Sequence, residues 1–497
     1  MGITYQTYGE CPFVKQNTFL HQTPEDAPLP VYQEIRGRLP KPVWDGHEDV
    51  LRCYDYAWQT AFGNLRRPKP GAGYVSNFID TAFNGCFFMW DTAFITMFGK
   101  YAAHVFNFQK SLDNLYSHQH PNGFICREIY EDELGESFHM YDPSSTGPNI
   151  LAWSEWQYFV QTGDLDRLER VFDPILAYHL WMKENRTWRD GTYYSSGWGC
   201  GMDNMPRMQP GYNVMFSHGH MVWVDACIQA VISAKHLVKM ARLLHREEDV
   251  KELAQEAETL SRFINEQLWD EKESFYFDLW KNGQLNHVKT IGSYWALLAD
   301  LVPDDRLAPF LAHLKNPKEF DRPHRVPSIS ADTPGYQPGG DYWRGSVWAP
   351  TNYMLLRGLE RVGRDELAYE IACNHLEQVV KVFCKTGTLW ENYAPESVER
   401  GSHSRPNFVG WTGLVPIAVL FEYVFGIRPD YERNRIVWQI RRTERHGVEH
   451  YPFGEADVTL ICAQRYDGER PEVTVESSIP VTVEVHCGAD VFEVRSR

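Results

Sequence analysis

The sequence lacks the features that place a protein in or on a membrane. Its 497 residues contain no run approaching the roughly 18–20 apolar residues that a membrane-spanning helix needs. The first residues, MGITYQTYGECPFVKQ, show no basic region followed by an apolar segment, so no secretory signal peptide is visible. Position 6 is Gln, where a myristoylation signal has Ser or Thr. We therefore expect a cytoplasmic protein with no membrane partner.

Metal-binding patterns are also missing. The 10 cysteines are scattered, with no CxxC pair, and no HExxH motif occurs. His118 and His120, like His218 and His220, are two residues apart, a spacing that does not put both side chains on one helix face. We expect reduced thiols and no metal or cofactor, although a structural calcium held by loop oxygens stays open.

Positive charge is scarce, whereas aromatic residues are abundant. Lys and Arg number 49 against 66 Asp and Glu, which gives a formal net charge of −17. Nucleic acids and anionic membranes select basic surfaces, so neither is an expected partner. Aromatic residues make up 14% of the chain and include 17 Trp. Trp suits both a large core and the stacking of sugar rings, and composition does not separate these two uses.

Helical periodicity dominates between residues 46 and 425. In residues 48–65, for example, apolar side chains recur every three or four positions. Gly163 and Asp164 are predicted to end one helix and cap the next. More apolar helices alternate with more amphipathic ones, which favours an inner helical ring surrounded by an outer ring. The expected helices are 48–65, 91–119, 149–163, 164–185, 217–245, 247–269, 290–301, 304–315, 345–363, 364–387 and 409–426.

The sequence suggests three parts. Residues 1–40, rich in Pro and polar groups, are expected to form an irregular N-terminal arm. Residues 41–427 are expected to form the helical toroid. In residues 428–497, apolar and polar residues alternate with period two, which predicts a small antiparallel, β-sandwich-like C-terminal domain.

Unusual residues are concentrated in the loops between helices. The segment SSGWGCGMDNMPRMQPGYN (195–213) holds one carboxylate, Asp203, and TGTLWENYAPES (386–397) holds Glu391. Long ordered loops in helical proteins tend to carry function. Each residue also has a structural interpretation: Asp203 as a turn residue, Glu391 as a surface residue, Asp91 as a helix N-cap, and Arg344 as the partner of a buried carboxylate.

Five motifs in order resemble glycoside hydrolase family 63 and, more distantly, the family 37 trehalases. They are FFMWDTAF, GMDNMPRM, GGDYWRGSVWAPTNY, LWENYAP and VGWTGLVP, and the resemblance spans about residues 44–426. It implies a mainly α protein with an (α/α)6 barrel that hydrolyses α-glycosidic bonds with inversion at the anomeric carbon.

The resemblance also implies residue roles. Asp203 corresponds to the general acid and Glu391 to the general base, while Trp90 and Asp91 would hold the sugar ring in the −1 subsite. Arg127 and Arg344 would reach sugar hydroxyls, and Trp411 would wall the pocket. The full set of expected substrate-binding residues is Trp90, Asp91, Arg127, Trp198, Arg344, Tyr393 and Trp411.

The chemistry of inversion fits these residue types. It needs a protonated carboxyl on the leaving oxygen and an ionised carboxylate roughly 6.5–9.5 Å away, with a water molecule between them. Apolar neighbours would raise the pKa of Asp203, provided that Arg207 turns outward or pairs elsewhere. Those expected neighbours are Met202, Met205, Met208 and Trp198.

We therefore expect an exo-acting α-glycosidase that removes one sugar, most readily glucose, from a small oligosaccharide or a glycoside such as glucosylglycerate. An α-mannoside such as mannosylglycerate is the next substrate candidate, and the loop 397–407 is a candidate lid. Two other classes stay open. One is a sugar 2-epimerase on the same toroid, with His218 or His403 placed centrally, and the other is a non-catalytic glycan-binding protein. The sequence leaves the oligomeric state undetermined.

Overall fold

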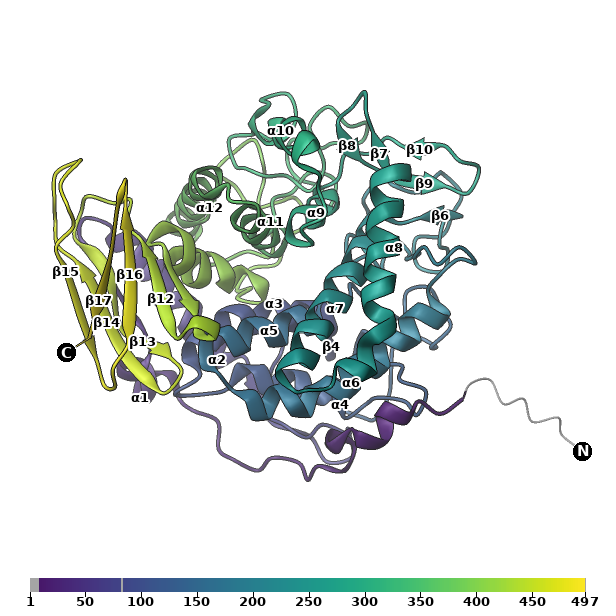
Figure 1. Ribbon diagram of the computed structural model, residues 1–497, viewed down its shortest axis with the longest axis horizontal. Helices are drawn as coiled ribbons and strands as arrows, with labels where there is room; N and C mark the ends of the chain where they lie inside the picture. The colour runs from purple at the N-terminus through teal and green to yellow at the C-terminus, as the bar shows by residue number, and fades with distance from the viewer. Residues whose placement is uncertain (1–8, 82–83, 497) are drawn as a thin grey trace, which may run out of the picture.

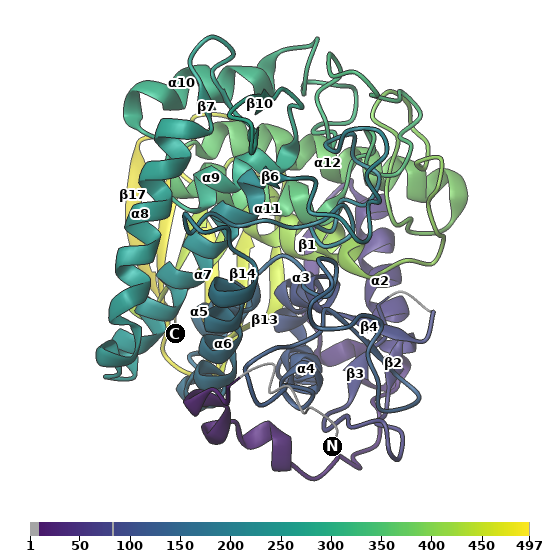
Figure 2. The ribbon, with the colours of Figure 1, turned by 90° about the vertical axis from the view of Figure 1, so that its right-hand side faces the viewer.

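A computed structural model describes residues 9–81 and 84–496. Helices form a ring, and the C-terminal strands pack against one side of it (Figure 1). In the perpendicular view of Figure 2, the yellow C-terminal strands lie behind the helical part. The fold is therefore helix-rich with a C-terminal region of sheet. Residues 1–8 of the expected arm and residue 497 of the expected β domain lie outside the described residues.

The described part of the N-terminal arm contains short helices rather than wholly irregular chain. The Asn17 side chain caps one of them by accepting from the Phe19 amide, and its own amide donates to the Tyr116 carbonyl. Phe19 is fully buried, which fixes the arm to the helical ring. The elements are η1 Pro12–Gln16, η2 Thr18–His21, α1 Tyr32–Ile35 and η3 Arg36–Arg38.

Six helical segments contact one another in a closed cycle and form the inside of the ring. In chain order they are α3 Met89–Gly99, α5 Leu151–Thr162, α7 Val224–Leu243, η7 Ile291–Tyr294 with α9 Trp295–Leu298, α11 Ala349–Arg361, and η9 Trp411–Leu414 with η10 Val415–Val424. Every residue of α3 and of η10 is buried, as expected for helices that are apolar on all sides.

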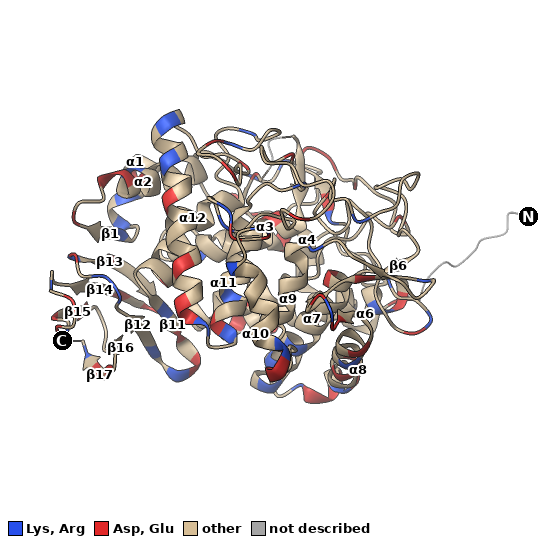
Figure 3. Cartoon of the chain, turned by 90° about the horizontal axis from the view of Figure 1, so that it is seen from above, with Lys and Arg blue, Asp and Glu red and all other residues tan. Residues whose placement is uncertain are grey.

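More amphipathic helices cover the outside. Figure 3 shows charged positions along α12 and α8, in agreement with the predicted alternation of apolar and amphipathic helices. Among the described residues, no helix is long and apolar enough to span a membrane. The outer and connecting helices are α2 Glu48–Gly63, η4 Lys100–Ala102, η5 Phe108–Leu112, α4 Asp113–Tyr116, α6 Leu165–Asn185, η6 Glu247–Val250, α8 Lys251–Gln267, α10 Asp304–Ala312, η8 His313–Lys315 and α12 Asp365–Thr386.

Two local predictions had different outcomes. The cap prediction is confirmed, because Gly163 ends α5 with φ of 70° and the Asp164 side chain accepts from the Arg167 amide. The single long helix expected over 91–119 is wrong, because α3 ends at Gly99. A side chain at Gly99 would overlap Phe108, and the Asn107 side chain caps a separate helix by accepting from the Gln109 amide.

The C-terminal region contains two four-stranded sheets, ordered β1-β13-β14-β15 and β11-β12-β16-β17. Strand β1 comes from before the helical ring and pairs antiparallel with β13. The expectation of a purely antiparallel region is wrong, because β12 and β16 are parallel. The chain passes through the other sheet between them. The strands are β1 Lys41–Trp44, β11 Ile427–Asp430, β12 Arg435–Gln439, β13 His446–Phe453, β14 Ala456–Cys462, β15 Val473–Ser477, β16 Thr482–Cys487 and β17 Asp490–Arg495. The short helix η11 Tyr431–Arg433 follows β11.

Short strand pairs brace the loops of the ring. The pair β4–β5 places Phe88 opposite Glu128, and therefore brings the start of α3 next to Arg127. These strands are β2 Leu65–Arg66, β3 Phe78–Ile79, β4 Cys86–Phe88, β5 Glu128–Tyr130, β6 Met221–Val222, β7 Trp269–Asp270, β8 Phe275–Tyr276, β9 Asp278–Trp280 and β10 Leu285–Asn286.

Candidate active site

One cavity of about 380 Å³ brings together most of the residues singled out in the sequence. Asp203 and Glu391 both line it, although they are far apart in the chain. The cavity lies at the N-terminal ends of the inner helices α3 and η9. Its lining residues are Asn84, Phe88, Trp90, Asp91, Arg127, Glu128, Trp198, Gly201, Asp203, Tyr342, Trp343, Glu391, Arg405, Phe408 and Trp411.

Asp203 is held by a hydrogen-bonded junction between two loops. The side chain of the next residue, Asn204, donates to the Asp341 carbonyl at 3.0 Å and accepts from the Trp343 amide at 2.8 Å. Gly201, two residues before Asp203, has φ of 76° and lies against the Trp90 ring. A Cβ at this position would come within 2.4 Å of an indole carbon. Only glycine therefore lets this loop pass so close to the indole.

Glu391 is positioned through both its side chain and its backbone. The Tyr342 hydroxyl donates to one carboxylate oxygen at 3.1 Å, and the Arg405 amide donates to the other at 3.3 Å. The Trp411 indole donates to the Glu391 carbonyl at 3.2 Å. Three segments of the chain thus fix the orientation of one carboxylate that faces the cavity.

Burial changes the protonation of both acids. The pKa of Asp203 is raised to about 6, mainly by desolvation, with the nearby Arg127 lowering it and Glu391 raising it. The pKa of Glu391 is also raised by desolvation, against the hydrogen bonds from Tyr342 and from the Arg405 amide. Two hydrogen bonds, from the Tyr342 hydroxyl and the Arg405 amide, favour the ionised form of Glu391. For Asp203 the main influences include one backbone hydrogen bond, from its own amide, and no side-chain donor.

Asp91 adds a third carboxyl to the same cavity. It lies in the first turn of α3, whose N-cap is Phe88, so the N-cap interpretation of Asp91 is wrong. Desolvation raises its pKa to about 8, against the nearby Arg127. At neutral pH this group is largely protonated and can donate a hydrogen bond as well as accept one.

Arg127 is the guanidinium that lowers the pKa of Asp91 and of Asp203, whereas Arg405 acts on Glu391. Its Nε donates to the Ser144 carbonyl at 2.6 Å, and its terminal nitrogen lies 3.6 Å from Glu128. The guanidinium also lies over the Phe138 ring at 4.7 Å. These contacts hold it at the cavity wall.

Aromatic rings form the rest of the wall. Trp90 lies 5.9 Å from Trp343 and 5.7 Å from Trp411, measured between ring centroids. Trp343 in turn stacks on Trp348 at 3.9 Å with an interplanar angle of 2°. Trp198 lines the cavity from the same loop as Asp203. Such rigid apolar faces suit the C–H faces of a sugar ring.

Two expected substrate-binding residues lie outside the cavity. Arg344 turns away and donates to the Gly335 carbonyl at 3.1 Å and to Asp341 at 3.2 Å. Tyr393 is 1% exposed, and its hydroxyl accepts from the Trp390 amide at 3.1 Å. Both residues support the loops that carry the site, and neither lines the cavity.

Other lining residues were not singled out by the sequence reasoning. Tyr342 precedes Arg344 in the same quoted motif, and its hydroxyl contacts Glu391 directly. Glu128 follows Arg127, and Phe408 follows the candidate lid loop. The available signal was the Tyr in the GGDYWRG motif, two residues before Arg344.

Arg207 pairs elsewhere, one of the two outcomes expected from the sequence if the pKa of Asp203 is to be raised. It is buried, and it donates to Asp225 at 2.6 and 2.9 Å and to Asp278 at 2.9 and 2.6 Å. It also lies over the Trp223 ring at 4.4 Å. Its charge is therefore neutralised away from the cavity of Asp203.

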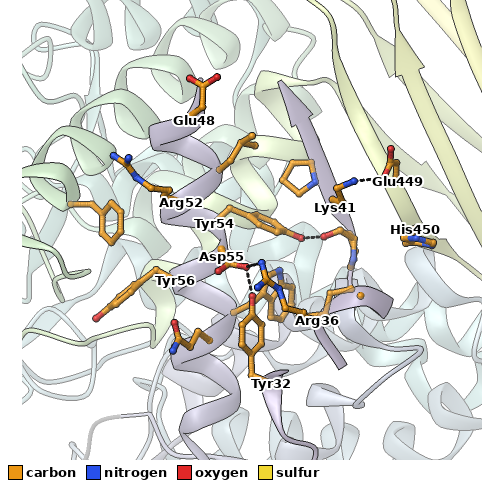
Figure 4. Close-up of a pocket in the computed structure, with 18 residues that line it drawn as sticks. Tyr32, Arg36, Lys41, Glu48, Arg52, Tyr54, Asp55, Tyr56, Glu449 and His450 are labelled. Carbon is orange, nitrogen blue, oxygen red and sulfur yellow. Dashed lines mark hydrogen bonds and ion pairs between the residues drawn. The ribbon is translucent and has the colours of Figure 1, made fainter. Parts of the chain in front are cut away.

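A larger cavity of about 850 Å³ lies between α1, α2, β1 and β13 (Figure 4). Two ion pairs join residues of its lining: Arg36 with Asp55 at 3.2 Å, and Lys41 with Glu449 at 2.8 Å. Figure 4 shows these pairs bridging its walls. The carboxylates of Asp55 and Glu449 are neutralised by these pairs, so size alone does not identify the reactive site.

Metal chemistry has no evident site in the described part of the chain. Within residues 9–81 and 84–496, no three His, Cys, Asp or Glu side chains gather in a way that could hold a metal ion. The ionisable groups that line the cavity are carboxyls, the Tyr342 phenol, and the guanidinium groups of Arg127 and Arg405.

Comparison with known proteins identifies the family. Residues 87–411 match the family model described as the mannosylglycerate hydrolase MGH1-like glycoside hydrolase domain. The chain belongs to this glycoside hydrolase family. The expected resemblance to family 63 is thereby confirmed, and the protein is a glycoside hydrolase.

Named relatives agree with this assignment. The chain is 25% identical over 286 residues to a probable mannosyl-oligosaccharide glucosidase of Schizosaccharomyces pombe, covering 54% of this chain but 33% of that protein. It is 22% identical over 355 residues to the mannosylglycerate hydrolase of Thermus thermophilus, covering 58% of this chain and 85% of that protein. An uncharacterized protein of Borreliella burgdorferi is 24% identical over 363 residues, covering 71% and 74%.

Solved structures share the fold. The family 63 mannosylglycerate hydrolase of Thermus thermophilus in complex with glucose gives a TM-score of 0.60 at 19% identity, covering 73% of this chain and 98% of that chain. The neutral trehalase of Saccharomyces cerevisiae gives a TM-score of 0.54 at 12% identity, covering 70% and 74%. At these identities the likeness concerns the fold alone.

Proposed function

We propose that the protein is an inverting exo-α-glycosidase, with Asp203 as general acid and Glu391 as general base. One observation carries the proposal: two carboxyls from separate loops line one cavity and have unequal surroundings. Asp203 has a pKa raised to about 6, whereas hydrogen-bond donors hold the carboxylate of Glu391. Such a division between two carboxyls is the usual basis of acid and base roles.

In the proposed reaction, Asp203 gives its proton to the glycosidic oxygen as the bond between that oxygen and the anomeric carbon breaks. Glu391 takes a proton from a water molecule whose oxygen forms the new bond to the anomeric carbon from the opposite face. Tyr342 and the Arg405 amide keep the carboxylate of Glu391 oriented toward that water. The first sugar product of an α-glycoside is then the β-anomer.

The proposed −1 subsite uses the remaining lining residues. Trp90, Trp198 and Trp411 would contact the apolar faces of the sugar ring, and Asp91 and Arg127 would bind its hydroxyls. Protonated Asp91 can donate to one hydroxyl, and Arg127 can donate to another. Arg344 and Tyr393 are proposed to act indirectly, by supporting the loops.

We further propose that residues 41–427 form an (α/α)6 catalytic barrel and that residues 428–497 form a separate β domain. The closed cycle of six inner segments and the likeness to the family 63 and trehalase structures support the barrel. The two four-stranded sheets support the β domain, although β1 joins it from outside these bounds.

Glucose is our first choice for the sugar released, from a small oligosaccharide or a small glycoside. The names of the relatives support both a glucosidase and a mannosylglycerate hydrolase, which makes an α-mannoside the second candidate. A cavity of about 380 Å³ is in the usual range for small-ligand sites. The 10 free cysteines support a cytoplasmic location.

A sugar 2-epimerase would need histidines at the centre of the cavity. His218 instead packs against Trp188, and His403 lies 3.2 Å from Asp341 with a side chain that is 73% exposed. Neither lines the cavity. The presence of both carboxyls also favours an enzyme over a non-catalytic glycan-binding protein.

The deciding experiment is product analysis by NMR on a panel of kojibiose, nigerose, trehalose, mannosylglycerate and glucosylglycerate. We expect one of these to be cleaved, with the β-anomer of the released sugar appearing first. An α-anomer as first product would contradict inversion. A new C2 epimer of a free reducing sugar would instead favour the epimerase.

A further inference from the structure

Another cavity lies toward the C-terminal ends of the inner helices, away from the proposed active site. It has a volume of about 320 Å³ and lies where α5, α7, α9 and α11 meet, neighbours around the ring (Figure 1). We call it the far pocket. Its lining residues are Trp153, Trp156, Gln157, Ile232, Lys235, His236, Lys239, Leu298, Ala299, Asp300, Arg357, Glu360 and Arg361.

The far pocket is separate from the proposed active site. Trp348 immediately precedes α11 and stacks on Trp343 of the catalytic cavity. Arg357 follows Trp348 by nine residues on the same helix, a rise of about 14 Å at 1.5 Å per residue. The two cavities therefore lie near opposite ends of the same helix.

Cationic side chains outnumber carboxylates in the far pocket. Of its four cations, Arg361 pairs with Asp300 at 2.9 Å, and Arg357 pairs with Glu360 at 3.0 Å. Arg357 also lies 3.3 Å from Glu422, which is shared with Lys100 beneath the pocket. Both carboxylates that line the pocket are therefore paired with arginines. The two remaining cations, Lys235 and Lys239, form no ion pair with either of them.

The two lysines have no carboxylate of their own. Lys235 donates to the Ala299 carbonyl at 2.5 Å and to the Asp300 carbonyl at 3.4 Å. Lys239 lies over the Trp156 ring at 5.3 Å, and among the described residues no carboxylate oxygen lies within 4.0 Å of its ammonium. The carboxylates of Glu432 and Asp300 attract Lys239 from farther away, while Arg361 and Arg242 repel it.

The two ammonium groups are consequently under-compensated. Burial lowers the pKa of Lys239 and of Lys235, neighbouring cations lower it further, and the attraction of Asp300 offsets only part of this effect. Cations near helix C-termini commonly offset the negative end of the helix dipole, and the contact of Lys235 with the end of α9 fits that role. It does not account for Lys239, which faces an indole rather than a carbonyl.

We propose that the far pocket binds a small phosphate-bearing molecule. A phosphate monoester carries about −1.5 to −2 charges at pH 7 and three strong acceptor oxygens, which match converging lysine and arginine donors. The indoles of Trp153 and Trp156 provide an apolar wall for the carbon skeleton of such a ligand. A binding site at this end of the ring is distinct from the glycosidase site.

The test is calorimetric titration of the full-length protein with inorganic phosphate at constant ionic strength. We expect saturable binding, weakened at least 10-fold by Lys239→Met and also weakened by Lys235→Met. The matched control is Lys381→Met on α12, where the lysine is 48% exposed and paired with Glu377. Its binding should equal that of the unaltered protein.

Circular dichroism and thermal melting would first establish that each variant folds. Absence of saturable binding to the unaltered protein would overturn the proposal and leave these cations as partners of helix ends and of Asp300 and Glu360. Binding that both Lys239→Met and Lys235→Met leave unchanged would also overturn it, because phosphate would then occupy another site. Neither result depends on whether the glycosidase proposal holds.

Discussion

Glu422 and Glu391 are both buried glutamates, yet their surroundings shift their acidity in opposite directions. Burial alone would raise the pKa of Glu422, but Lys100 at 2.9 Å and Arg357 at 3.3 Å outweigh that effect and lower it. Glu391 accepts from a phenol and an amide, which do not offset desolvation, so its pKa is raised. The first glutamate is fixed in its ionised form, and the second can change protonation during a reaction.

The same contrast holds between larger groups of charges. Arg207 neutralises Asp225 and Asp278 through four hydrogen bonds, away from the catalytic cavity. In the proposed catalytic cavity, by contrast, the two carboxyls of Asp91 and Asp203 share the influence of Arg127. Incomplete compensation, rather than burial itself, therefore distinguishes the proposed site of chemistry.

The largest expected effect comes from removing either proposed catalytic carboxyl. Asp203→Asn or Glu391→Gln should lower kcat/KM by about 10²–10⁴-fold, because each removes one proton transfer. Thermal melting should stay unchanged or rise, since each substitution removes a buried, poorly compensated acid. Retention of more than a tenth of the activity by both variants would contradict the assigned roles.

Removing the charge of Arg207, which neutralises Asp225 and Asp278, should lower the stability of the protein. Arg207→Met would leave Asp225 and Asp278 buried without a partner, which typically costs about 3–5 kcal/mol of unfolding free energy. The control is Arg262→Met, which breaks an exposed pair with Glu258 at 3.2 Å and should cost less than about 1 kcal/mol. Denaturant unfolding would measure both, and equal effects would refute the contrast between buried and exposed pairs.

Local signals predicted the helices well, whereas distant partners were harder to foresee. The Gly163–Asp164 junction carries its own capping chemistry, so its position followed from two residues. Strand β1 carries no comparable signal for its pairing with β13, because the partner lies near the other end of the chain. The break after Gly99 likewise depends on contact with Phe108.

In the site, residue type was more predictable than side-chain direction. Asp203 and Glu391, both singled out from the motifs, line one cavity, and its lining also includes Trp90, Asp91, Arg127, Trp198 and Trp411. Arg344 was expected to face the sugar, but the Gly335 carbonyl and Asp341 hold it elsewhere. A loop side chain is oriented by such tertiary hydrogen bonds, which the sequence pattern does not encode.

A smaller loss of kcat/KM should show whether Asp91 acts in its protonated or its ionised form. With a pKa of about 8, this carboxyl is neutral at pH 6, and Asn preserves its shape and one donor. Asp91→Asn should therefore lower kcat/KM at pH 6 by less than Asp203→Asn does, on the order of 10-fold, and by less than Asp91→Ala. Steady-state kinetics at pH 6 would compare the three. Equal losses in Asp91→Asn and Asp91→Ala would mean that the ionised form of Asp91 is required.

The smallest expected effect concerns the hydrogen bond that holds the proposed base. Tyr342→Phe removes a donor that favours ionised Glu391, so the pKa of Glu391 should rise further, by about one unit for a bond worth about 1.5 kcal/mol. Because the base must be ionised, the acidic limb of the kcat/KM profile should move to higher pH. The alkaline limb depends on protonated Asp203, with a pKa of about 6, and activity should still fall as pH rises through that value.

A full pH profile of the Tyr342→Phe variant would separate these limbs, with Tyr336→Phe as the control. Tyr336 donates to Glu396 at 2.6 Å, outside the cavity, so its loss should leave both limbs in place. Movement of the alkaline limb instead of the acidic one would assign the Tyr342 contact to the acid, and the roles of the two carboxyls would have to be exchanged. After that exchange the same cavity would still be the proposed site of chemistry, but the attacking water would lie on the Asp203 side of the cavity instead of the Glu391 side.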